Sequence, residues 1–113
     1  MVLFLDDENV ILGLYREMMS GQGIPFETTT NPHEALAKLR EHPFTMVVTD
    51  QRMPVMTGTE FIPLAKEIRP EAKIFMVTAT PPGQAESPLP ANHVIRKPFD
   101  VLRMRRLIHQ HAV

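Results

Sequence analysis

Short apolar runs alternate along this chain with longer stretches in which apolar residues recur at helical spacing. The first pattern is typical of buried strands and the second of amphipathic helices. The apolar runs predict strands over residues 2–5, 26–30, 45–49, 73–77 and 93–96. The helical spacing predicts helices over residues 8–21, from Pro32 onward, over 59–69 and from Asp100 to 110. Regular alternation of strands and helices favours a doubly wound α/β fold, a parallel sheet with helices on both faces.

The segments that flank these helices contain typical start and stop residues. Asn31 and Asp100 have the short polar side chains that cap helix N-termini, and a proline follows Asn31 where proline is well tolerated. Gly21 and Gly23 are expected to end the first helix. Pro63 is expected in or near the first turn of its helix, where proline is less costly than further in.

Each predicted helix has a stripe of apolar residues that is expected to face the sheet. The residues expected to face inward are Val10, Ile11, Leu14, Met18, Met19, Ala35, Leu36, Leu39, Phe61, Leu64, Ala65, Ile68, Val101, Leu102, Met104, Leu107 and Ile108.

The fourth crossover, between the last two strands, departs from the pattern. Pro81, Pro82, Pro88 and Pro90 remove backbone donors and restrict the residues that precede them. We therefore expect residues 81–92 to form an irregular or single-turn segment in place of a full helix.

Composition excludes several classes of protein. The chain has 113 residues, which suits one domain over residues 1–113, and its formal net charge of −1 gives no surface for nucleic acid or membrane. Arg103, Arg105 and Arg106 are interpreted as a solvated helix face. The chain has no cysteine, which excludes disulfides and thiolate metal sites. No apolar run approaches the ~20 residues of a membrane span, so a cytoplasmic location is the default expectation.

Four predicted strands end at polar residues of different chemistry. Asp6 and Asp7 follow the first strand, Asp50 the third, Thr78 the fourth and Lys97 the fifth. The carboxyl ends of parallel strands meet at one edge of the sheet, where ligands bind in such folds. Clustered carboxylates favour a hard cation such as Mg²⁺, and a nearby ammonium can bind a phosphoryl group. The sequence therefore predicts a site for a divalent metal and a phosphoryl group.

Four segments carry a resemblance to a known family. They are residues 5–8 (LDDE), 50–58 (DQRMPVMTG), 77–79 (VTA) and 97–99 (KPF). In this order they resemble the receiver domain of two-component response regulators over essentially the whole chain. The resemblance implies a flavodoxin-like sheet of strand order 2-1-3-4-5, with the proline-rich fourth crossover as an atypical feature.

The resemblance also implies roles for individual residues. Asp50 would accept a phosphoryl group, and Mg²⁺ would be bound by Asp7, by Asp50 and by the backbone carbonyl of Arg52. Asp6 would act mostly through a water molecule bound to the metal.

Three residues near the ends of the last two strands complete the implied site. Lys97 would pair with Asp50 or with the phosphoryl oxygens, and Thr78 would move to the phosphoryl group. Pro98 would follow a cis peptide bond. A carboxylate nucleophile needs no general base, so the chemistry consists of alignment and charge neutralisation.

The implied function is a phosphorylation-dependent signalling switch. The phosphoryl group would come from a histidine kinase or a phosphotransfer protein, and the chain would not be an enzyme beyond weak self-dephosphorylation. One alternative is a docking or dimerisation module of the same fold that makes little use of phosphorylation. A second is a phosphohydrolase with an aspartyl-phosphate intermediate. Those sites carry a second acid two residues after the nucleophile, where this chain has Arg52.

Two departures from the family concern signal output. Val94 occupies the position that usually holds an aromatic switch residue, and the separation between Thr78 and Lys97 is shorter than usual. The sequence leaves open the cognate kinase, an effector domain or downstream protein, and formation of a homodimer.

Overall fold

The computed structural model describes residues 1–79 and 93–112 of the chain. Its elements are β1 (Val2–Leu5), α1 (Asn9–Met19), β2 (Phe26–Thr29), α2 (Pro32–Glu41), β3 (Met46–Asp50), α3 (Gly58–Ile68), β4 (Lys73–Thr78), β5 (His93–Arg96) and α4 (Val101–His111). The predicted strands and helices are all present, with bounds shifted by one or two residues. The expectation for residues 81–92 lies outside the described residues.

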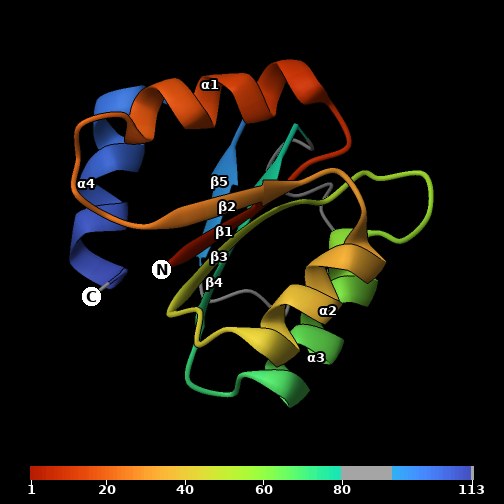
Figure 1. The fold of residues 1–113 in the computed structure, drawn as a ribbon. Coiled ribbons are helices and arrows are strands. Elements are labelled where there is room, and N and C mark those ends of the chain that lie inside the picture. The colour runs from red at the N-terminus through yellow and green to blue at the C-terminus, as the bar shows by residue number, and fades with distance from the viewer. Residues whose placement is uncertain (80–92, 113) are drawn as a thin grey trace.

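The strands form one parallel sheet in the order β2-β1-β3-β4-β5. Helices α1 and α4 cover one face of the sheet, and α2 and α3 cover the other (Figure 1). The doubly wound fold and the predicted strand order are therefore confirmed. No helix within residues 1–79 and 93–112 combines the length and the apolar character needed to cross a membrane.

Strand alternation divides the core into two layers. In β1, Val2 and Phe4 pack toward α1 and α4, while Leu3 and Leu5 pack toward α2 and α3. All four side chains are at most 1% exposed, because both faces of the sheet are covered. Such strands read as continuous apolar runs, which is why they were visible in the sequence.

Side-chain caps fix where several helices begin. Asn31 Oδ1 accepts hydrogen bonds from the backbone N–H groups of His33 (2.8 Å) and Glu34 (3.4 Å). Asp100 caps α4 in the same way. Helix α3 begins with a capping box, in which Thr57 and Glu60 each accept from the other's backbone N–H. The first two caps confirm the sequence prediction.

Three predicted inward positions are wrong. Val10 is 82% exposed, Leu64 is 41% exposed and Leu102 is 63% exposed. The buried face of α1 instead includes Leu12 and Tyr15, each 1% exposed. The first helix contains the nearly continuous apolar run Val10-Ile11-Leu12-Gly13-Leu14, so its periodicity did not select one face.

The position of Pro63 is also a correction. Because α3 already begins at Gly58, Pro63 lies inside the helix, beyond its first turn.

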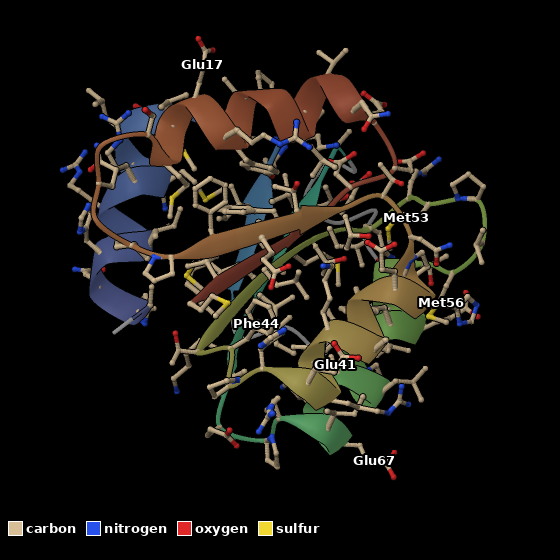
Figure 2. All side chains as sticks on the ribbon, in the orientation of Figure 1. Glu17, Glu41, Phe44, Met53, Met56 and Glu67 are labelled. Carbon is tan, nitrogen blue, oxygen red and sulfur yellow. The ribbon has the colours of Figure 1, made fainter. Side chains whose placement is uncertain are left out.

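On the same side of the sheet, Figure 2 shows Phe44 directed toward the protein interior near α2 and α3, whereas Glu41 and Glu67 point outward.

The corrected face of α1 gives a paired test. Leu12→Ala removes a fully buried side chain and should lower the free energy of unfolding by about 2 to 5 kcal/mol. Val10 is 82% exposed, so Val10→Ala should change the free energy of unfolding by no more than about 0.5 kcal/mol. Urea unfolding followed by circular dichroism measures both. Equal losses in the two variants would contradict the observed orientation of α1.

Candidate functional site

The strand register brings two carboxylates together at the end of the sheet. Leu5 is the last residue of β1 and pairs with Thr49 of β3. The residues that follow this pair, Asp6 and Asp50, therefore lie side by side at the carboxyl ends of the two strands. Both are buried, Asp6 at 1% exposure and Asp50 at 6%. Asp7 is more exposed, and one carboxylate oxygen from each of the three acids lies within 4.8 Å of the others. The predicted acidic cluster is therefore present.

Lys97 reaches this cluster from the end of β5. Its Nζ lies 3.2 Å from Asp50 Oδ1 and 3.5 Å from Asp6 Oδ2. The backbone places the side chain here, since Lys97 N–H donates to the carbonyl of Thr78 (2.8 Å). The peptide bond between Lys97 and Pro98 is cis, as the resemblance to receiver domains implied. One ammonium therefore faces two buried carboxylates.

Burial leaves the acids incompletely stabilised in their charged forms. Loss of hydration raises the pKa of Asp6 to about 6, and the neighbouring Asp50 and Asp7 carboxylates add to the rise. Burial also raises the pKa of Asp50, although Lys97 and the N–H of Gln51 act in the opposite direction. Burial lowers the pKa of Lys97, but the charges of Asp50 and Asp6 outweigh that effect and leave it raised.

Thr78 and Arg52 differ in their exposure to solvent. Thr78 is buried, 3% exposed, at the end of β4, one residue beyond the partner of Asp50 in the sheet. Arg52 is exposed in the loop after β3. Their predicted roles, a phosphoryl contact and a carbonyl ligand to a metal, stay predictions.

An aromatic stack lies next to the acids on the α1 side of the sheet. The ring of Tyr15 stacks on Phe4, with centroids 4.4 Å apart, and on Phe99, with centroids 5.6 Å apart. Phe99 follows the Lys97-Pro98 peptide, so this stack ties the lysine-bearing loop to β1 and α1. Burial and the charges of Asp6 and Asp50 raise the pKa of Tyr15. Tyr15 was not predicted from the sequence to lie in this region.

Comparison with known proteins identifies the family in which this arrangement of residues occurs. Residues 2–109 match the model of the response regulator receiver domain. The chain belongs to this family. Receiver domains are signalling modules that bind Mg²⁺ at an acidic pocket, and in this chain Asp6, Asp7 and Asp50 form such an acidic cluster.

Two relatives differ in how much of them the receiver domain covers. CpdR of Brucella abortus, a response regulator receiver protein, is 30% identical over 112 residues, which cover 96% of this chain and 91% of CpdR. PilR of Pseudomonas aeruginosa, a response regulator, is 26% identical over 94% of this chain and 24% of PilR. This chain therefore matches nearly the whole of one relative and about a quarter of the other.

Solved structures show the same fold. A CheY-like receiver domain from Methanospirillum hungatei superposes with a TM-score of 0.86 at 27% identity, covering 96% of this chain and 90% of that one. The chemotaxis protein CheY4 of Vibrio cholerae gives 0.84 at 29% identity, covering 97% and 96%. The receiver fold thus extends over nearly all of the chain.

The donor set fits the ion that receivers bind. Carboxylate oxygens are the ligands that Mg²⁺ prefers, and those of Asp6, Asp7 and Asp50 converge at one point. Three acids against one ammonium leave an excess of negative charge there. That excess favours a divalent cation over a neutral ligand.

The raised pKa of Asp6 predicts how stability depends on pH in metal-free protein. Its folded pKa of about 6 lies above the unfolded value of 3.8, so protonation stabilises the fold and the gain is lost as pH rises through 6. At pH 5 the gain relative to pH 7.5 should be about 1.4 kcal/mol, and Asp50 adds in the same direction.

Urea unfolding in EDTA at the two pH values measures this difference. Asp6→Asn should be more stable than wild type at pH 7.5 and should show a smaller pH dependence. A wild-type protein that becomes less stable between pH 7.5 and pH 5 would contradict the assigned direction.

Proposed function

We propose that this receiver domain is a phosphorylation-dependent signalling switch whose phosphoacceptor is Asp50. The supporting observation is the position of its carboxylate, buried at the end of β3 and held 3.2 Å from Lys97 within the acidic cluster. A histidine kinase or phosphotransfer protein of the same two-component system is the proposed donor, and the cytoplasm the proposed location.

The carboxylate of Asp50 is oriented before any donor arrives. Its Oδ1 accepts a hydrogen bond from the N–H of Gln51 at 2.9 Å and lies 3.2 Å from the Lys97 ammonium. Two contacts on one oxygen restrict the rotation of the carboxylate. Such preorientation of a nucleophile removes part of the entropic barrier to transfer.

The proposed transfer balances as a single displacement. An Asp50 carboxylate oxygen attacks the phosphorus of a phosphohistidine, a P–O bond forms and the P–N bond breaks. The imidazole nitrogen keeps the bonding electron pair and takes a proton. Lys97 neutralises charge on the transferring oxygens, and Thr78 is proposed to donate its hydroxyl to one of them.

Asp7 and Asp50, with the carbonyl of Arg52, are the proposed ligands of Mg²⁺, and Asp6 acts through a bound water. When bound, the ion supplies positive charge toward the phosphoryl oxygens. The chain's own residues supply alignment and exclusion of bulk water. The protein is proposed to act once per signal and to lack turnover beyond slow self-dephosphorylation.

The alternative function is a receiver-fold docking or dimerisation module that makes little use of phosphorylation. Burying Asp6 and Asp50 costs stability, which a module of that kind has no reason to retain. A phosphohydrolase is disfavoured because Arg52 stands where that class needs a second acid.

The phosphoacceptor is tested by labelling with acetyl phosphate and Mg²⁺. Asp50→Asn should abolish the mass increase of one phosphoryl group, because the amide is not a nucleophile of this kind. Glu8→Gln, a change of the same type at an exposed acid near the site, should label like wild type. Labelling of Asp50→Asn at the wild-type level would refute the assignment, and an unlabelled wild type would favour the docking module.

The metal ligands are tested by titration with Mg²⁺. Tyr15 is the single tyrosine of a chain without tryptophan, and the charges of Asp6 and Asp50 act on it, so its fluorescence reports on the site. Asp7→Ala should weaken Mg²⁺ binding by about tenfold or more, since it removes a charged ligand. Glu8→Ala should leave the affinity near wild type. Equal effects of the two substitutions would exclude Asp7 as a ligand.

A further inference from the structure

The loop that follows the proposed phosphoacceptor is closed by the side chain of Gln51. Its Oε1 accepts a hydrogen bond from the backbone N–H of Thr59 at 2.8 Å, and its Nε2 donates to Thr59 Oγ1 at 2.7 Å. These bonds span eight residues and join the end of β3 to the second residue of α3. We call Gln51, Gly58 and Thr59 the Gln51 brace.

The backbone of Gln51 connects this brace to the acidic site. Its N–H lies 2.9 Å from Asp50 Oδ1 and 3.1 Å from the carbonyl of Val77 in β4. Its carbonyl accepts from Gly58 N–H at 2.8 Å. One residue therefore contacts the Asp50 carboxylate, the neighbouring strand and the start of α3. A rotation of the Gln51 peptide would move the donor away from the carboxylate.

Gly58 allows α3 to begin directly against Asp50. A Cβ at this position would lie 2.7 Å from the carbonyl oxygen of Asp50 and 2.9 Å from Gln51 Oε1. Both distances are shorter than van der Waals contact permits. Because only a glycine fits, the start of α3 packs directly against the backbone of Asp50.

Helix α3 uses separate groups for its own N-terminal capping. The N–H groups of Gly58 and Thr59 are bonded by Gln51, while that of Glu60 is bonded by Thr57 in the capping box. The two sets stabilise the same helix end, but only the first touches Asp50. Their effects on stability and on chemistry can therefore be separated by mutation.

We infer that the Gln51 brace positions the Asp50 carboxylate for phosphoryl transfer, with Gln51 as a positioning residue that acts through its own peptide N–H. This inference rests on the proposed function. Loss of the side-chain bonds to Thr59 leaves the Gln51 backbone held only by its bonds to Val77 and Gly58, and the contact of its N–H with Asp50 Oδ1 is weakened. The transfer slows because the nucleophile is less well aligned, while the charges of the metal site are unchanged.

The rate of phosphorylation by acetyl phosphate at saturating Mg²⁺ tests the inference. In this reaction the P–O bond of acetyl phosphate breaks and acetate leaves. Gln51→Leu should slow labelling about tenfold, because it removes every side-chain bond of the brace at similar size. Thr59→Val keeps its N–H bond and should slow labelling less. Thr59→Ser retains both groups and should label like wild type.

A double variant shows whether the two residues act through each other. Gln51→Leu combined with Thr59→Val should label no more slowly than Gln51→Leu alone, since the shared bonds are already lost. Additive slowing would overturn the inference, because it would mean that the two side chains act independently.

The matched control is Thr57→Val, which breaks the capping box of α3 without touching Gln51. It should lower the unfolding midpoint of the protein to an extent similar to that of Thr59→Val, yet label at the wild-type rate. If Thr57→Val slows labelling as much as the brace variants do, the brace is merely structural and the inference fails. Should Gln51→Leu not fold, the comparison of Thr59→Val with Thr57→Val decides alone.

Failure of the inference is distinguishable from failure of the proposed function. Wild-type protein that takes no label, or Asp50→Asn that takes it normally, overturns the function. Wild-type protein that labels on Asp50, together with Gln51→Leu that labels equally fast, overturns the brace alone. The fluorescence titration of Mg²⁺ should give similar affinities for Gln51→Leu and wild type, because no charged ligand is changed.

Discussion

The contacts of Lys97 with Asp6 and Asp50 are the interaction on which the carboxyl edge of this sheet depends. Two carboxylates are buried there side by side, and burial of a charge is tolerated only where a partner offsets the lost hydration. The rest of the architecture holds that partner in reach. The backbone bond from Lys97 to Thr78 fixes one side of its loop, and the stack of Phe99 on Tyr15 fixes the other. The lysine neutralises only part of the charge, and the remaining negative potential suits a divalent cation.

Much of this edge could be predicted because strand ends are visible in a sequence. Asp50 and Lys97 each follow a short apolar run, and in a parallel sheet such positions converge whatever the details of packing. The register between β1 and β3 then places Asp6 beside Asp50 without further information. These predictions depended on backbone topology alone, which few residues can change. The role of Thr78 depends on where one hydroxyl points, so the apolar pattern did not determine it.

Features that depend on side-chain geometry were not predictable in this way. Val10 and Leu12 belong to one apolar run, and only contact with the sheet decides which of them is buried. The pairing of Gln51 with Thr59 closes a loop whose conformation is set by Gly58 and by packing, and nothing in the residue types requires it. Met53, which lies in the same loop, packs into the core beside α2 and α3 (Figure 2). The loop is thus anchored on both sides by contacts that no periodicity reveals.

The opposite edge of the sheet has a different consequence, which concerns chain connectivity. Thr45 donates its N–H to the carbonyl of Met1 (3.0 Å) and its hydroxyl to the carbonyl of Ala112, so these two residues lie beside each other at the amino ends of the strands (Figure 1). A short linker between them and a new break in the turn at Gly21 and Gly23 would give a circular permutant with the same strand neighbours. In that permutant β1 would be the last strand of the chain and still the central partner of β2 and β3. The chemistry at the carboxyl edge depends on which strands are adjacent, and the order in which the chain visits them is a separate variable.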